Sequence, residues 1–160
     1  MCVIEAPRVE DTEAAAAALG RLVRAGDVIA LVGDLGAGKT TFVKGLAVGM
    51  GFAALVTSPT FTLVHIYEGA RAVLFHVDLY RLDDDSQLLD VGLDDLYRQE
   101  GVVAVEWFDR FPRAAPRDYL EVRLSVGADG TRTLAPAPHG ARAAALAEAW
   151  EAAVSASTGR

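Results

Sequence analysis

The chain has 160 residues and a mass of 16.9 kDa, enough for one domain with a sizeable core and too little for several. Hydrophobic residues make up 52% and charged residues 23%, which excludes a wholly disordered or collagen-like chain. Fifteen Lys and Arg against 22 Asp and Glu leave a net charge of -7. Binding to a nucleic-acid backbone requires clustered cations, so we expect any nucleic acid to be met through a partner.

Cysteine usage and hydropathy indicate the compartment. Cys2 is the only cysteine, which excludes an intramolecular disulfide and fits a reducing, cytoplasmic environment. The first residues have neither the basic nor the apolar region of a secretory signal. Residues 45–64 carry no charge, but their glycines, Pro59 and hydroxyl side chains are typical of a helix end, a strand and a loop. We therefore expect a cytoplasmic protein with no membrane contact.

Hydrophobic periodicity and turn residues predict alternating helices and strands. The expected helices are 13–25 behind an N-cap at Asp11 or Thr12, 39–50, one or two short helices within 83–99, and 141–154 before a frayed end at 155–160. The expected strands are 27–32, 62–66, 72–77, 102–105, 119–126 and 131–134. The wholly apolar strands suit a parallel sheet buried on both faces, and the two short connections suit hairpins. The sequence therefore predicts one α/β domain over residues 1–160, with three layers and a mixed, largely parallel sheet.

A glycine-rich turn carries the clearest chemical signal. Residues 33–40, Gly-Asp-Leu-Gly-Ala-Gly-Lys-Thr, match the pattern G-x-x-x-x-G-K-[ST] and lie between a predicted buried strand and a predicted helix. Lys39 and Lys44 are the only lysines, so abundance does not explain a lysine at the motif position. The pattern indicates a phosphate-binding P-loop rather than a solvated turn.

Each residue type in this motif has a physical role. Gly33, Gly36 and Gly38 let the backbone curl, so that successive N–H groups point into one hollow at the start of a helix. Such a hollow suits a β-phosphate. Lys39 would reach the β and γ oxygens, and the Thr40 hydroxyl would ligate Mg²⁺.

A P-loop needs an acidic residue from another strand to hold the metal or its water shell, and two apolar runs end in one. Glu106 follows the strand 102–105, and Asp78 follows residues 73–77. Either carboxylate could instead cap a following helix. We assign Glu106 to Mg²⁺, and Asp78 to the attacking water or the outer shell of the metal.

Other polar and aromatic residues have two interpretations each. The segment 57–61, stiffened by a proline, is a switch loop that senses the γ-phosphate or an ordinary turn. His65 and His76 are interpreted as strand residues that face the core or a rim. Trp107 reports on the nucleotide or packs in the core. The aspartates of residues 83–95 form a solvated face or dock a basic partner.

Missing motifs narrow the class of nucleotide-binding protein. The sequence has no N-K-x-D to read guanine and no D-x-x-G switch, which disfavours a GTPase. It has no L-S-G-G-Q stretch, which excludes the ABC-type ATPases.

Four sequence blocks, in the same order, resemble one protein family. The blocks are residues 33–42 (GDLGAGKTTF), 58–64 (SPTFTLV), 76–82 (HVDLYRL) and 106–107 (EW). By these blocks the chain resembles the TsaE family, small bacterial P-loop ATPases of the tRNA threonylcarbamoyladenosine (t6A) pathway. The resemblance covers nearly the whole chain, and only the C-terminal helix lacks distinctive features.

The resemblance implies a nucleotide and a set of contacts. The nucleotide is ATP, with Mg²⁺ bound by Thr40 and Glu106, and catalysis is expected from Lys39, Asp78 and Glu106. Thr12 and Arg132 are expected to flank the adenine end. The full set of expected nucleotide contacts is Thr12, Gly33, Gly36, Ala37, Gly38, Lys39, Thr40, Thr41, Thr60, Asp78 and Arg132.

The resemblance also implies partners. They are the TsaD and TsaB proteins; TsaD transfers the threonylcarbamoyl group to tRNA, and the ATPase resets the assembly, so that tRNA is met only indirectly. No residue is an obvious arginine finger, although Arg81 is a candidate, so slow hydrolysis gated by a partner is expected. The alternatives are a small-molecule P-loop kinase, which would need an arginine-bearing lid, and a nucleotide-dependent adaptor that does not hydrolyse ATP.

Overall fold

The computed structural model describes residues 2–52, 56–59, 62–69 and 71–158. Its strands are β1 (Ile4–Ala6), β2 (Val28–Val32), β3 (Val64–Glu68), β4 (Val73–Asp78), β5 (Val102–Glu106), β6 (Tyr119–Val126) and β7 (Arg132–His139). Its α-helices are α1 (Val9–Gly20), α2 (Lys39–Gly49), α3 (Asp85–Val91), α4 (Leu93–Arg98) and α5 (Ala141–Thr158). Two 3₁₀ turns, Phe108–Arg110 and Pro112–Ala114, follow β5. No helix in these described ranges is long and apolar enough to cross a membrane.

The strands form one sheet in the order β1-β7-β6-β2-β5-β4-β3. The four central strands, β6, β2, β5 and β4, pair in parallel, and the outer pairings β3 with β4, β6 with β7, and β1 with β7 are antiparallel. Parallel central strands all end at the same edge of the sheet. That edge receives the glycine-rich turn after β2 and the acidic residues at the ends of β4 and β5.

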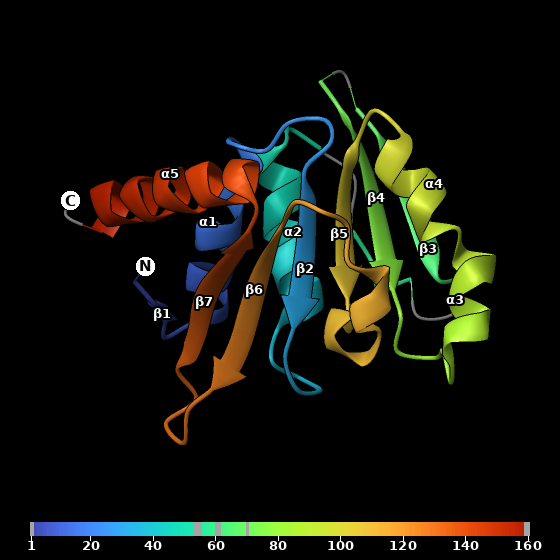
Figure 1. Ribbon diagram of the computed structural model, residues 1–160. Helices are drawn as coiled ribbons and strands as arrows, with labels where there is room; N and C mark the ends of the chain where they lie inside the picture. The colour runs from blue at the N-terminus through green and yellow to red at the C-terminus, as the bar shows by residue number, and fades with distance from the viewer. Residues whose placement is uncertain (1, 53–55, 60–61, 70, 159–160) are drawn as a thin grey trace.

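Helices cover both faces of the sheet, as Figure 1 shows. One core joins α1, α2 and α5 to one face through residues such as Ile29, Leu31 and Leu46. The second core joins α3, α4 and the 3₁₀ turns to the other face through residues such as Ala30 and Val105. Neighbouring residues of β2 enter opposite cores, because side chains alternate along a strand. The predicted three-layer α/β fold with a mixed sheet is confirmed.

Helices α1 and α2 cross with their backbones in close contact. A Cβ atom added to Gly20 would lie 2.2 Å from the carbonyl oxygen of Leu46, and one added to Gly49 would lie 2.1 Å from that of Ala17. Only glycine permits these approaches. The contact fixes α2, which begins at the glycine-rich turn, against the rest of the fold.

The predicted limits of α1 were wrong at both ends. The helix begins at Val9, and Asp11 lies inside its first turn, where its carboxylate accepts the backbone N–H of Arg8 at 3.0 Å. An aspartate at the third helical position satisfies a free N–H as an N-cap does, so the sequence signal fits both registers. The helix ends at Gly20 against α2 rather than at Ala25.

Other limits shift by at most two residues, such as β3 at Val64–Glu68 against the expected 62–66, and three differences are larger. β1 was not predicted, because three residues carry too little periodicity. β7 continues to His139 although Pro136 and Pro138 follow the predicted end at Leu134. Within the described chain, β1 pairs with residues 132–134 of β7, and the later part of β7 pairs only with β6, so the prolines lie at a sheet edge that needs no N–H donor. Helix α5 extends to Thr158, past the expected end at Val154.

Helix α5 is fastened to the other helices by Trp150. This side chain is fully buried, and its indole Nε1–H donates to the carbonyl oxygen of Ala15 in α1 at 2.8 Å. Its ring meets that of Phe42 in α2 edge to face, with centroids 5.8 Å apart. The start of α5 is fixed separately, because Asp118 accepts the backbone N–H groups of Arg142 and Ala143.

Candidate active site

The site is built around the turn between β2 and α2. Gly36 and Gly38 have φ angles of 80° and 105°, in the left-handed region that glycine adopts without strain. A Cβ added to Gly33 would lie 2.4 Å from the carbonyl oxygen of Leu124 on β6. Gly38 is the N-cap of α2, so the turn delivers the chain directly to a helix N-terminus. The backbone thus has the form that the sequence motif requires.

Lys39 is the first residue of α2, and its side chain folds back over the turn. The Nζ atom donates to the carbonyl oxygens of Gly33 at 2.6 Å and Asp34 at 2.9 Å. It also lies 3.7 Å from the ring centroid of Trp107, a cation–π contact. Burial lowers the pKa of Lys39, although the nearby carboxylates, Glu106 foremost, act in the opposite direction. The ammonium group is therefore held at the mouth of the turn by acceptors that phosphate oxygens could replace.

Glu106 ends β5 and makes the contact expected of a metal-binding pair. Its Oε1 atom accepts a hydrogen bond from the Thr40 hydroxyl at 2.8 Å. The same atom lies 2.8 Å from Nε2 of His76 on β4. Glu106 is only 3% exposed, so its carboxylate is fixed at the bottom of the site. The contact with His76 was not predicted, but two-residue alternation along β4 places His76 on the same face as Asp78, which was a usable signal.

Asp78 ends β4 directly beside Glu106. The two residues are register partners in the parallel pairing of β4 and β5. Asp78 accepts the backbone N–H of Tyr80 at 2.9 Å and the hydroxyl of Ser58 at 3.2 Å. Ser58 belongs to the proposed switch loop, so that loop touches the acid expected to act on the attacking water.

These side chains line one pocket of about 350 Å³. Its lining residues are Leu35, Gly36, Gly38, Lys39, Thr40, Thr41, Ser58, Asp78, Tyr80, Glu106, Trp107 and Arg132. The structure therefore brings together most of the predicted site, including Arg132 from β7, whose Nε would lie 3.4 Å from a Cβ added to Gly38.

Three predicted residues that the structure describes stand apart from this lining. Gly33 and Ala37 belong to the turn itself, where Gly33 provides an acceptor for Lys39 and Ala37 is buried in the core. Thr12 is fully buried in α1, and its hydroxyl has no hydrogen-bond partner within the described chain. Thr60 lies outside the described residues.

An aromatic pair forms one wall of the pocket. Tyr80 and Trp107 have ring centroids 4.9 Å apart, and each comes one or two residues after an acidic strand end. Trp107 has a φ angle of 61°, a strained conformation for a residue with a large side chain. The tryptophan was proposed to report on the nucleotide or to pack in the core, and it contacts the P-loop lysine. The role of Tyr80 was not predicted.

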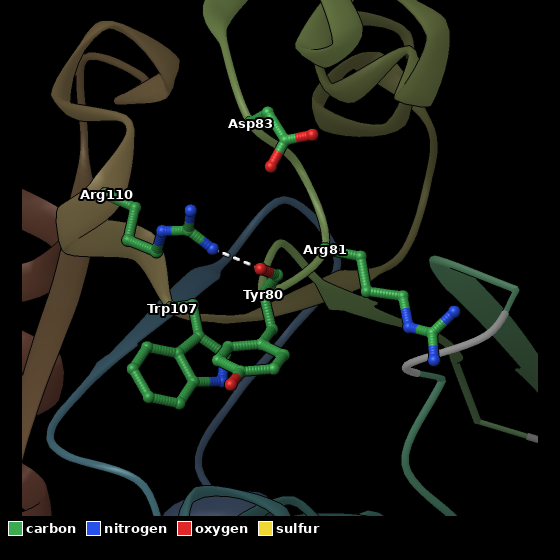
Figure 2. A pocket seen from close by; sticks show the side chains of 5 residues that line it. All are labelled: Tyr80, Arg81, Asp83, Trp107 and Arg110. Atoms are coloured by element: carbon green, nitrogen blue, oxygen red, sulfur yellow. Dashed lines mark hydrogen bonds between the residues drawn. The ribbon is translucent and has the colours of Figure 1, made fainter.

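Figure 2 shows a second hollow that the same aromatic pair lines. Its volume is about 560 Å³, and Tyr80 and Trp107 share it with Arg81, Asp83 and Arg110. The guanidinium of Arg110 donates to the carbonyl oxygen of Tyr80. The Arg81 side chain extends away from the aromatic pair in this view.

The donor set fits Mg²⁺. A hydroxyl and a carboxylate in contact are hard oxygen ligands, and Mg²⁺ usually takes one or two such groups together with substrate phosphates and waters. No cluster of three or more His, Cys, Asp or Glu side chains suited to a metal occurs in the residues that the structure describes. The geometry thus suits a metal that arrives with a phosphate ligand.

A buried parallel strand, a glycine-rich turn, a helix that begins with Lys-Thr, and an acid on the neighbouring strand together define a P-loop nucleoside triphosphatase fold. Residues 6–134 match the family model described as threonylcarbamoyl adenosine biosynthesis protein TsaE. The chain belongs to the TsaE family.

Individual relatives agree with this family. The chain is 40% identical over 125 residues to the tRNA threonylcarbamoyladenosine biosynthesis protein TsaE of Bacillus subtilis, a match that covers 78% of each chain. It is 42% identical to the protein of the same name from Treponema pallidum, over 78% of this chain and 92% of the relative. Among solved structures, Bacillus subtilis YdiB superposes with a TM-score of 0.82 at 32% identity, covering 94% of this chain and 93% of that one.

Proposed function

We propose that this protein is a Mg²⁺-dependent ATP hydrolase that acts as a partner-gated component of the tRNA threonylcarbamoyladenosine machinery in the cytoplasm. One observation carries the catalytic part of the proposal. Thr40 and Glu106, 66 residues apart in sequence, are joined by a 2.8 Å hydrogen bond in the pocket that also holds Lys39 and Asp78. The biological part rests on family membership and on the names of the relatives.

Each side chain has a distinct role in hydrolysis. The N–H groups of residues 33–38 and the ammonium of Lys39 bind the β- and γ-phosphates, for which Lys39 exchanges its two carbonyl acceptors for phosphate oxygens. Thr40 and Glu106 hold Mg²⁺, which when bound neutralises negative charge on the phosphates. Asp78 orients the attacking water, because it lies beside Glu106 and lines the same pocket.

Among the described residues, Lys39 and Arg132 are the cations that line the pocket. Arg81 and Arg110 line the neighbouring hollow instead, and Figure 2 shows Arg81 extending away from the aromatic pair. Arginine fingers raise phosphoryl-transfer rates by large factors. We therefore infer that hydrolysis is slow in the isolated chain and faster when a partner completes the site.

The proposed partners are the TsaD and TsaB proteins, with tRNA met only through them. A net charge of -7 opposes direct tRNA binding. The contact between Ser58 and Asp78 links the switch segment to the γ-phosphate side of the pocket, so the surface presented to partners depends on the nucleotide.

A retention experiment tests the gating. The chain is immobilised and offered TsaD and TsaB with a non-hydrolysable ATP analogue, with ADP, or without nucleotide, at near-physiological salt. We expect retention to differ among the three states, and a Lys39→Ala variant to show the same retention in all of them. Equal retention by the unaltered chain, or tight binding of tRNA by the isolated chain, contradicts the gating.

A further inference from the structure

His76 is a buried ionisable side chain to which the hydrolytic roles above assign no function. It lies in the middle of β4, is fully buried, and points to the α2 side of the sheet together with Asp78. Its Nε2 atom is 2.8 Å from Glu106 Oε1. Its Nδ1 atom has no hydrogen-bond partner within the part of the chain that the structure describes.

A side chain that only filled the core would not need this arrangement, which lowers the stability of the fold. A hydrogen bond to a carboxylate oxygen requires a proton on Nε2, and Nδ1 is then a buried polar atom without a partner in the described chain. Burial of an unsatisfied polar atom destabilises a fold, and an aliphatic side chain would avoid that loss. The ring is accommodated because its register partner on β5 is the small residue Ala104.

The imidazole and the Thr40 hydroxyl share one acceptor. Both donate to Oε1 of Glu106, each at 2.8 Å. The hydroxyl is itself an expected metal ligand and can rotate, whereas the imidazole is enclosed on all sides and cannot leave. His76 is therefore the fixed donor that sets the rotation of the Glu106 carboxylate.

We propose that His76 is a positioning residue: its Nε2–H bond holds the Glu106 carboxylate in the orientation in which it receives Mg²⁺. This inference rests on the proposed function, because it requires a metal at Glu106. Donors that orient a metal ligand from outside the coordination shell change metal affinity by about 10- to 100-fold when they are removed.

The test compares two amide variants that are similar in chemistry and differ in reach. His76→Gln places an amide N–H near the position of Nε2, whereas His76→Asn is one methylene shorter and does not reach Glu106. Calorimetry measures the dissociation constant of ADP with excess Mg²⁺ and with EDTA. The dissociation constant in EDTA divided by that in Mg²⁺ reports the contribution of the metal, and a smaller ratio means a smaller contribution. His65→Asn, at the register partner of His76 on β3, is the matched control.

We expect His76→Asn to reduce this ratio by about tenfold or more and His76→Gln to stay within about threefold of the unaltered chain. The affinity for ADP in EDTA should not change in either variant. In a Glu106→Ala background, His76→Asn should have no further effect on the ratio.

Three results would overturn the inference: an unchanged ratio in His76→Asn, equal losses in the two amide variants, or a further loss in the Glu106→Ala background. If the Asn variant does not fold, the Gln variant decides alone, because a loss beyond about threefold contradicts the proposal. If Mg²⁺ does not affect ADP binding by the unaltered chain, the metal site fails, and the inference fails with it.

Discussion

The two tryptophans lie in regions that differ in what holds them: apolar packing around Trp150, and polar and charged groups around Trp107. Trp150 of α5 is fully buried against α1 and α2, where its ring packs on Phe42 and its N–H group has a hydrogen-bond acceptor. Trp107 is half-buried at the mouth of the P-loop, on a strained backbone, and contacts a lysine whose pKa is lowered by burial. Both regions hold the same helix, α2. The comparison teaches that the body of α2 is fixed by packing, so that its N-terminal end can carry costly polar groups.

The largest effect is expected where packing dominates. Trp150→Ala removes a fully buried ring and leaves the carbonyl of Ala15 without its donor, so the free energy of unfolding should fall by about 3 to 5 kcal/mol. Urea denaturation measures the loss. Leu89→Ala, at a side chain that is 81% exposed, is the control and should change the value by less than about 0.5 kcal/mol. A loss below about 1 kcal/mol for Trp150→Ala would show that α5 is not an anchor.

The second variant, Lys39→Ala, should remove activity while the free energy of unfolding stays nearly unchanged. Lys39→Ala takes a point charge from the phosphate hollow, and we expect turnover to fall by about 100- to 1000-fold. The free energy of unfolding should change little, because the variant loses two backbone hydrogen bonds but also the cost of burying a charge. Phosphate release and urea denaturation on the same sample separate the two effects. Unchanged hydrolysis by the folded variant would contradict the P-loop assignment.

The two acids should differ in their metal dependence. Glu106→Ala removes a proposed Mg²⁺ ligand, so excess Mg²⁺ should restore part of the lost activity. Asp78→Ala removes the group that orients water and should not respond to Mg²⁺. Titration of Mg²⁺ against hydrolysis rate measures both. Rescue of Asp78→Ala but not of Glu106→Ala would reverse the two assignments.

The smallest effect is spectroscopic. Binding of ATP withdraws Lys39 from its contacts with the turn, and the environment of Trp107 should change with it. We expect a nucleotide-dependent change in tryptophan fluorescence that persists in Trp150→Phe and is lost in Trp107→Phe. A change that disappears only in Trp150→Phe would place the response in the core.

Sequence patterns predicted the local parts of this molecule and failed where distant segments meet. The P-loop could be predicted because its glycines and Lys39 act within eight consecutive residues. Asp78 and Glu106 were expected near one site because each ends an apolar run, and alternation along β4 places His76 on the same face as Asp78. The hydrogen bond of His76 to Glu106 also depends on the pairing of β4 with β5, which no local pattern contains. The boundary at Leu134 was misplaced because prolines stop most strands, and the edge position of β7 is a property of the whole sheet.

The most direct test of the central claim is phosphate release from ATP by the purified chain, measured alone and with TsaD and TsaB, in Mg²⁺ and in EDTA. The account predicts slow release by the chain alone, faster release with the partners, and loss of both in EDTA and in Lys39→Ala. Release that is absent under every condition would leave a nucleotide-binding adaptor in place of an enzyme. Release that persists in EDTA or in Lys39→Ala would contradict the assignment of hydrolysis to this site.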